Sequence, residues 1–308
     1  MRRARYRLWL ATMLLTTTGL ALAVSPAASD ALLQQGEYIY RATACQGCHT
    51  DAKQHGKLLA GGHALTTPFG TFYTPNITPD IETGIGRWSE QDFIRAMRVG
   101  ISPSGDHYYP TFPYTAYTKL TDDDLRALWA FLKAQKPVKQ TNRNHDLNWM
   151  VRSRSFVGTW KRLYFTPSVY QADSAKSATW NRGAYLADAA AHCGECHTPR
   201  NQWGGIKANL RYAGAGEGPG GGVVSNITPD KKTGIGNWRP SELVEYMATG
   251  LTPDGDSAGD LMADVIDNSL KYLSKEDLAA IAEYVLSLPP VENAVHKPKK
   301  PIKKETFE

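Results

Sequence analysis

The sequence predicts an all-α fold built twice, as two tandem helical domains joined by a packed irregular linker. Residues 76–100 match residues 226–250 at an offset of 150 positions, and 12 of the 25 aligned residues are identical without a gap. Apolar residues recur at helical spacing in both copies, and no convincing alternation typical of strands accompanies them.

Both copies predict the same order of elements. A loop containing Asn-Ile-Thr-Pro-Asp and Thr-Gly-Ile-Gly leads into a helix that stops at Gly100 in one copy and at Gly250 in the other. A second helix follows each, capped by Thr121 or Ser274. We therefore expect two domains of one architecture.

The segment between the copies is rich in aromatic residues such as Trp149, Phe156 and Trp160. This composition is too aromatic for a disordered linker, so we expect the segment to pack over both domains. The expected boundaries are a first domain over 30–136, a linker over 137–178 and a second domain over 179–290.

Charge gathers at the two ends of the 308-residue chain. Four Arg and no acid lie in residues 1–29, and five Lys face three Glu in residues 291–308. Of the formal charge of +5, residues 30–290 therefore keep about −1, which gives no indication of nucleic-acid binding. The basic 291–308 segment is expected to be a solvated tail, with a contact to anionic lipid or to a partner as the alternative.

Residues 1–29 have the layout of a signal peptide. A basic start precedes a 17-residue apolar run over 8–24, and small residues at 27–29 offer a cleavage site. We expect export to the periplasm. An uncleaved anchor, and hence membrane association, is the alternative, because 17 residues is at the lower limit for a spanning helix.

All four cysteines fall in two C-x-x-C-H motifs, the pattern that attaches c-type haem. Two thiols three positions apart add to the two vinyl groups of one porphyrin, and the following histidine ligates the iron. The sequence thus predicts two covalently bound haem c groups. The residues are Cys45, Cys48 and His49 for the first, and Cys193, Cys196 and His197 for the second.

Three other interpretations of the cysteines are weaker. A thioredoxin-like site does not require the histidine and would not usually occur twice without a βαβ pattern. A zinc site would bring the four thiols close together, whereas 148 positions separate the pairs. Disulfides within C-x-x-C are geometrically poor structural links.

A c-type haem usually takes His on one side of the iron and Met on the other. Met262 lies in an expected loop between the helices of the second domain, so we predict it as the sixth ligand of the second haem. Met97 and Met247 are equivalent in the repeat and are expected in the core. At the 150-residue offset Met262 pairs with Phe112, and because the offset later grows to 153, a slip of three would pair it with Tyr109 instead. No Met lies between 98 and 149.

The sixth ligand of the first haem therefore stays open. His107 is the candidate from the same loop, Lys119 or a tyrosine is weaker, and an empty position covered by Phe112 is the third alternative. Loss of Met should lower the potential of the first haem relative to the second.

The runs around GIGRWSEQDFIRAMRVG and YYPTFPYTAYTKLTDDDLRAL, together with WNRGAYLADAAAHCGECHTPRN, resemble a known family. These are the cytochrome c subunits of bacterial membrane-associated alcohol and gluconate dehydrogenases, and their relatives serving molybdenum hydroxylases. The resemblance covers about residues 34–290 and implies two class I cytochrome c domains. It also supports Met262 as a ligand. Many members carry three haems and a Met in the loop that here contains Phe112.

What the resemblance implies is electron transfer from a dehydrogenase catalytic subunit (molybdenum, flavin or quinone type) towards quinone or an oxidase. The sequence shows no other catalytic constellation, so a non-catalytic electron-transfer subunit is expected. A dihaem enzyme of peroxidase or thiosulfate dehydrogenase type, using an open first haem, is the alternative. A haem-based gas sensor is a third, weaker interpretation, because no signalling module is visible.

Overall fold

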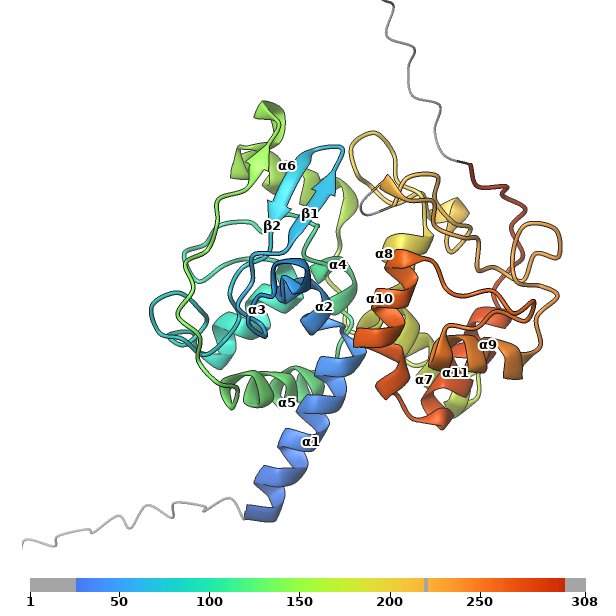
Figure 1. Cartoon of the computed structure of the whole chain (residues 1–308), viewed down its shortest axis with the longest axis horizontal. Helices are drawn as coiled ribbons and strands as arrows, with labels where there is room; N and C mark the ends of the chain where they lie inside the picture. The colour runs from blue at the N-terminus through green and yellow to red at the C-terminus, as the bar shows by residue number, and fades with distance from the viewer. Residues whose placement is uncertain (1–25, 219–220, 297–308) are drawn as a thin grey trace, which may run out of the picture.

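The computed structural model describes residues 26–218 and 221–296, and most elements in this part of the chain are helices (Figure 1). We call residues up to 136 the first half and residues from 178 onward the second half. The signal peptide predicted over 1–29 and the basic tail predicted over 291–308 lie largely outside the described residues. None of the helices described is both long and apolar enough to cross a membrane.

The first half and the connecting segment contain these elements: α1 (Pro26–Ala42), α2 (Cys45–His49), η1 (Ala52–Gln54), β1 (Ala64–Thr67), β2 (Gly70–Tyr73), α3 (Glu90–Val99), α4 (Tyr114–Tyr117), α5 (Asp122–Lys133), β3 (Asp146–Leu147), η2 (Trp149–Val151) and α6 (Arg154–Tyr164). The second half contains α7 (Ala178–Tyr185), the π-helical turn η3 (Leu186–Ala190), α8 (Cys193–His197), η4 (Ala208–Leu210), α9 (Pro240–Thr249), α10 (Asp260–Asn268), η6 (Leu270–Tyr272) and α11 (Lys275–Leu286).

The predicted helix stops and caps are confirmed. Helices α3 and α9 end at Gly100 (φ 59°) and Gly250 (φ 82°), a left-handed backbone conformation that glycine adopts at little cost. The hydroxyls of Thr121 and Ser274 accept backbone N–H groups in the first turns of α5 and α11. Local chemistry therefore starts and ends equivalent helices at equivalent positions.

The expectation of a fold without strands was wrong in one region. Strands β1, β2 and β3 form a small antiparallel sheet, with Ala64 paired to Tyr73 and Gly70 paired to Leu147. Because β3 comes from the predicted linker, the sheet fastens the start of the linker to the first half.

The linker packs against both halves, as expected from its aromatic content. The indole N–H of Trp160 on α6 donates to the Trp203 carbonyl at 2.9 Å. Further along, the Tyr170 N–H donates to the Lys119 carbonyl at 3.0 Å, and the Tyr170 ring lies 5.5 Å from that of Tyr185.

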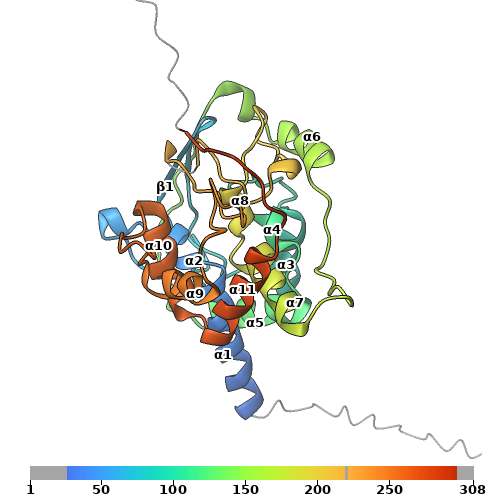
Figure 2. The same cartoon turned by 90° about the vertical axis from the view of Figure 1, so that its right-hand side faces the viewer.

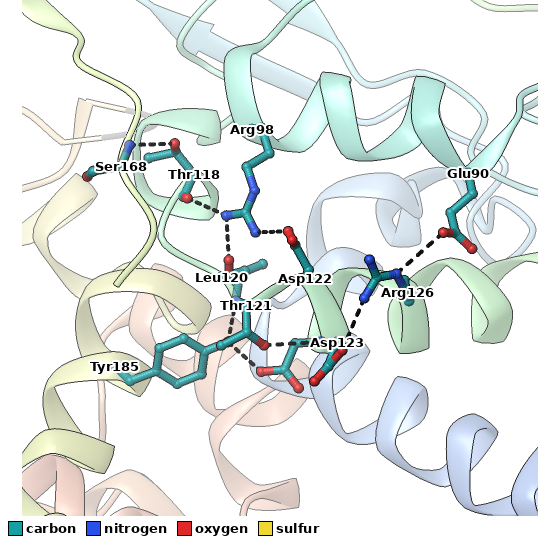
Figure 3. Close-up of polar contacts among 11 residues, drawn as sticks. Glu90, Arg98, Thr118, Leu120, Thr121, Asp122, Asp123, Arg126, Ser168 and Tyr185 are labelled. Atoms are coloured by element: carbon teal, nitrogen blue, oxygen red, sulfur yellow. Dashed lines mark hydrogen bonds and ion pairs between the residues drawn. The ribbon is translucent and has the colours of Figure 1, made fainter. Parts of the chain in front are cut away.

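One hydrophobic cluster continues through both halves, and Figures 1 and 2 show the helices of the two halves side by side. Tyr185 of α7 reaches across the boundary, where its hydroxyl accepts the Thr121 N–H at 3.1 Å and donates to the Asp124 carboxylate (Figure 3). Asp124 is a buried acid whose other oxygen accepts from Gln35 at 2.8 Å.

The same contact occurs with the halves exchanged. Tyr38 of α1 donates to the Asp277 carboxylate at 2.5 Å, and its hydroxyl accepts the Ser274 N–H at 3.2 Å. Tyr38 and Tyr185 are equivalent in the repeat, and so are Asp277 and Asp124. Reciprocal contacts of this kind define an isologous interface, so the two halves meet about an approximate twofold axis.

A second reciprocal pair lies closer to the cysteine motifs. The Thr115 hydroxyl donates to Glu195 inside the second motif at 2.6 Å. The equivalent Asn268 contacts Gly47 inside the first motif, where an added Cβ would lie 3.6 Å from the Asn268 Cβ. Each half thus touches the C-x-x-C-H helix of the other.

Arg98 distinguishes the first half. Its guanidinium donates to the carbonyls of Thr118 and Leu120 and pairs with Asp122 at 2.5 Å (Figure 3). The equivalent residue is Ala248, and the second half has three additional residues and the helix α10 in this region. These contacts fix the turn between α4 and α5.

Candidate haem sites

Each C-x-x-C-H motif forms one short helix with the same entry and exit. Ala44 (φ 53°) precedes α2 and His192 (φ 42°) precedes α8, both in the left-handed region that non-glycine residues rarely adopt. Thr50 and Thr198 then leave in extended conformation. The backbone therefore places the two thiols and the histidine within a single compact turn in both halves.

Both motif histidines are held in the tautomer that an iron ligand needs. Nδ1 of His49 lies 2.8 Å from the Pro75 carbonyl oxygen, and Nδ1 of His197 lies 2.8 Å from the Ser225 carbonyl oxygen. A carbonyl can only accept, so Nδ1 carries the proton and Nε2 keeps its lone pair. Burial lowers the pKa of both imidazoles, which favours the neutral form that binds metal.

A shared backbone frame supports these histidines. The carbonyl of His49 accepts the Gly61 N–H at 2.8 Å, and that of His197 accepts the Gly214 N–H at 2.8 Å. Gly61 has a φ of 76°, and an added Cβ would lie 2.5 Å from the Thr74 carbonyl oxygen. Gly214, the first residue of the glycine-rich run 214–222, thus belongs to the second site.

The Asn-Ile-Thr-Pro-Asp loops form the rest of this frame. Asn76 donates to the Val138 carbonyl at 2.8 Å, and the equivalent Asn226 donates to the Val291 carbonyl at 2.8 Å. Both asparagines are buried, and each accepts from the threonine two positions on. The repeated sequence therefore encodes the support of the histidine loop.

The donor set fits two covalent haems. All four cysteines are free thiols. In the part of the chain that the structure describes, no three His, Cys, Asp or Glu side chains gather in a way that could hold a metal ion, so the thiols are not arranged as a zinc site. Burial raises the pKa of Cys45 to about 11 and that of Cys193 to about 12, which leaves these thiols protonated at neutral pH.

The two motifs lie near one another across the interface. The Tyr117 hydroxyl donates to the carbonyl of Thr43, two residues before Cys45, at 2.8 Å. Tyr117 sits beside both motifs: Cys45 and Cys48 help to raise its pKa after burial, and its ring lies 5.4 Å from that of His192. Groups attached to the two motifs would therefore face a common boundary.

Met262 is half-buried against the main hydrophobic cluster. The structure places it on α10 rather than in a loop, which corrects the sequence expectation. Met97 and Met247 are buried in the core, as expected. Phe112 packs against the same cluster, with its ring 5.8 Å from that of Tyr117.

The 150-residue offset is confirmed up to Tyr108 and Ala258, because each donates its N–H to the glycine that ends the preceding helix. The offset is 153 once Thr115 and Asn268 are reached, so the three additional residues of the second half fall within the stretch that contains Met262 and forms α10.

His107 packs against helix α6. It forms a bridge with Ile101, and a Cβ added at Gly158 of α6 would lie 3.0 Å from the His107 Nε2. Its Nδ1 is buried without a hydrogen-bond partner. Because the ring contacts α6 and its equivalent is Ser257, this placement gives no support to His107 as the sixth ligand of the first haem.

Sequence reasoning missed the residues that join the halves. Tyr38, Tyr185, Asp124 and Asp277 are each repeated at equivalent positions, and that repetition was the available signal. Their partners are 61 and 239 positions away, so the sequence alone could not pair them.

Comparisons with known proteins agree with this geometry. The cytochrome c family model matches residues 33–136. A "Diheme cytochrome c-type" protein of Cereibacter sphaeroides is 43% identical over 263 residues, which cover 84% of this chain and 86% of that protein.

Two further relatives are longer than this chain. A nicotinate dehydrogenase component of Pseudomonas putida is 41% identical over 84% of this chain but only 22% of its own length. The fructose dehydrogenase cytochrome subunit of Gluconobacter japonicus is 39% identical over 83% of this chain and 52% of its own length. The chain belongs to the c-type cytochrome family that includes the dihaem cytochromes and the cytochrome subunits of dehydrogenases.

Proposed function

We propose that this protein carries two haem c groups and passes electrons from a dehydrogenase catalytic subunit to a respiratory acceptor. The observation that carries this proposal is the frame built twice around the C-x-x-C-H motifs. In each copy the histidine Nδ1 donates to a carbonyl and Nε2 is left for iron. Bound haem supplies a reversible one-electron centre, and the protein supplies ligands, burial and relative placement.

The first haem is assigned to Cys45, Cys48 and His49, in a cytochrome c domain over 30–136. The second is assigned to Cys193, Cys196 and His197, in a second such domain over 179–290, with the linker 137–178 packed between. Met262 is the proposed sixth ligand of the second haem. Phe112 offers no ligand atom to the first, so two unlike haems in two like frames are expected.

The proposed donor follows from the names of the relatives, which include cytochrome subunits of fructose, gluconate and alcohol dehydrogenases. The acceptor would be a quinone or an oxidase. The signal-like residues 1–29 support a periplasmic location, and the basic residues 291–308 support peripheral association with the membrane as an additional feature.

Haem content tests the proposal directly. The purified protein should contain two haems per chain, and Cys193→Ala/Cys196→Ala should contain one while keeping the spectrum of the other. A single haem in the wild type, or loss of both in the double variant, would contradict the assignment. Recovery of the native protein together with a dehydrogenase would support the role as a subunit.

The lack of a methionine between residues 98 and 149 supports a second candidate function. An aromatic side chain opposite His49 would leave an open coordination position, as a dihaem peroxidase or a thiosulfate-oxidising cytochrome requires. Ready binding of cyanide or carbon monoxide to one haem, with turnover of peroxide or thiosulfate, would favour the enzyme. No ligand binding and no turnover would favour electron transfer alone.

A further inference from the structure

Large apolar side chains are exposed along and beside α6. They lie on three segments: the turn η2, the end of α6, and the loop that follows the second motif. We call this surface the α6 face, and it comprises Trp149, Met150, Leu163, Tyr164, Trp203 and Ile206. Trp149 is 81% exposed, Leu163 is 71% exposed and Trp203 is 50% exposed, whereas tryptophan and leucine are normally buried.

The end of α6 and the 201–206 loop form one continuous surface. The Trp160 indole donates to the Trp203 carbonyl, and the Asn201 amide lies 3.4 Å from the Tyr164 hydroxyl. The Gly205 backbone packs on the Tyr164 ring, because an added Cβ would lie 2.4 Å from it. The exposed side chains here are therefore held in place by these contacts rather than left on a loose loop.

The α6 face is basic. Residues 149–164 contain Arg152, Arg154, Lys161 and Arg162 and no acid. Lys161 is buried, but Arg154 and Arg162 line an open cleft of about 470 Å³ together with His107 and a single acid, Asp106. Exposed tryptophan, tyrosine and methionine among arginines is the composition of protein–protein interfaces.

The α6 face also leads to the second motif. A cleft of about 250 Å³ is lined by Tyr164 and Ile206 at one side and by Gly194 and Glu195 of α8 at the other. The motif residues that line it are not the cysteines or the histidine. The α6 face therefore adjoins α8.

Position favours a protein over a lipid surface as the occupant. The start of α1, to which the signal-like segment joins, lies at the opposite end of the molecule from α6 (Figure 1). If that segment stays in the membrane, the α6 face points away from it. A partner with an acidic rim and an apolar centre would match the arginines and the exposed aromatics.

We propose that the α6 face is the docking surface for the dehydrogenase catalytic subunit, and that docking places that subunit next to α8 and the second haem. This inference rests on the proposed function. It further assigns which surface, and which of the two motifs, the partner meets.

The test compares variants of the full-length, haem-loaded protein, produced with an affinity tag in its own host. Leu163→Glu and Trp203→Glu each place a charge on the α6 face. Ile81→Glu is the matched control, because Ile81 is 60% exposed but lies outside the α6 face. An unchanged haem spectrum shows that each variant is folded, and dye-linked dehydrogenase activity retained on the resin measures docking.

We expect the wild type and Ile81→Glu to retain equal dehydrogenase activity. Leu163→Glu and Trp203→Glu should each retain at least about tenfold less, as truncation of central interface residues typically costs. Arg162→Glu should reduce the retained dehydrogenase activity more at low salt than at high salt.

Two outcomes would overturn the inference. If both α6-face variants retain wild-type activity, docking occurs elsewhere and the proposed function still stands. If the wild type retains no dehydrogenase at all, both proposals fail. A further arm measures sedimentation with vesicles of phosphatidylglycerol and phosphatidylcholine. Loss of vesicle binding in the variants, with dehydrogenase retained, would identify the α6 face as a lipid-binding surface instead.

Discussion

Replacing Tyr185 by Phe should destabilise the protein more than replacing Tyr38 by Phe, although the two tyrosines are equivalent in the repeat. Each hydroxyl crosses between the halves to a carboxylate and also accepts a backbone N–H. The difference lies in what each carboxylate keeps afterwards. Asp124 would keep only the Gln35 amide, whereas Asp277 would keep two donors from the Arg182 guanidinium, at 2.9 and 2.7 Å.

The magnitudes follow from these partners. A hydrogen bond to a charged group contributes about 1.5–3 kcal/mol, and a buried group left unpaired costs a further ~1 kcal/mol or more. Tyr185→Phe should therefore cost about 3 kcal/mol, because Asp124 is only 8% exposed. Tyr38→Phe should cost about 1 kcal/mol. The cost is small because Arg182 still pairs with Asp277. Burial alone would raise the pKa of Asp277, but Arg182 holds this pKa below its usual range. Ser274 is exposed, so water can replace the tyrosine hydroxyl as the acceptor of its N–H.

Thermal unfolding of the haem-loaded protein, followed by circular dichroism, measures the difference. At about 2–4 °C of Tm per kcal/mol for a chain of roughly this size, Tyr185→Phe should lower Tm by about 6–12 °C and Tyr38→Phe by about 2–4 °C. Equal losses, or a larger loss for Tyr38→Phe, would refute the reasoning that the arginine compensates on one side only.

Three further outcomes are expected. Gly183→Ala should lower Tm by several degrees, because the added Cβ would lie 1.9 Å from the Ala280 carbonyl oxygen. Gly222→Ala is the control: the nearest atom to its added Cβ would be 4.0 Å away, so its Tm should lie within about a degree of the wild-type value. Burial lowers the pKa of Lys161 from 10.5 to about 8. Between these pH values the unfolded chain binds more protons than the folded protein, so the contribution of Lys161 to the free energy of unfolding increases as pH rises from 8 towards 10. Thermal unfolding at pH 8 and pH 10 should show the Tm of the wild type rising relative to that of Lys161→Met. A difference in Tm that is the same at both pH values would contradict this expectation. Phe112→Met should introduce the Met–iron charge-transfer band at the first haem and raise its potential, and an unchanged spectrum and titration would show that this loop does not face the iron.

Features encoded in short stretches could be predicted from the sequence. The C-x-x-C-H motifs, the Thr121 and Ser274 caps and the Gly100 and Gly250 stops depend on residues within a few positions of one another. The repeat then carried each assignment from one half to the other.

Two local features were missed for identifiable reasons. The helix that contains Met262 has apolar residues at helical spacing, but its counterpart around Phe112 contains Pro110 and Pro113, which favoured a loop in both copies. Strands β1 and β2 have four residues each, too few for alternation to be distinguished. The interface between halves depends on contacts across 61 to 239 positions, which no local pattern encodes.

The charges near the two motifs differ, but these differences should affect the two proposed haems little. Equivalent positions carry different charges: Asp188 of the second half corresponds to Arg41 of the first. Arg41 stacks over the Tyr272 ring at 4.2 Å and pairs with Glu37, and Asp188 pairs with Arg211. Because each of these charges has an opposite partner, their effects on the two iron centres largely cancel. The lack of a methionine in the corresponding stretch of the first half has no such compensation, so we expect the sixth ligand to set the order of the potentials of the two proposed haems.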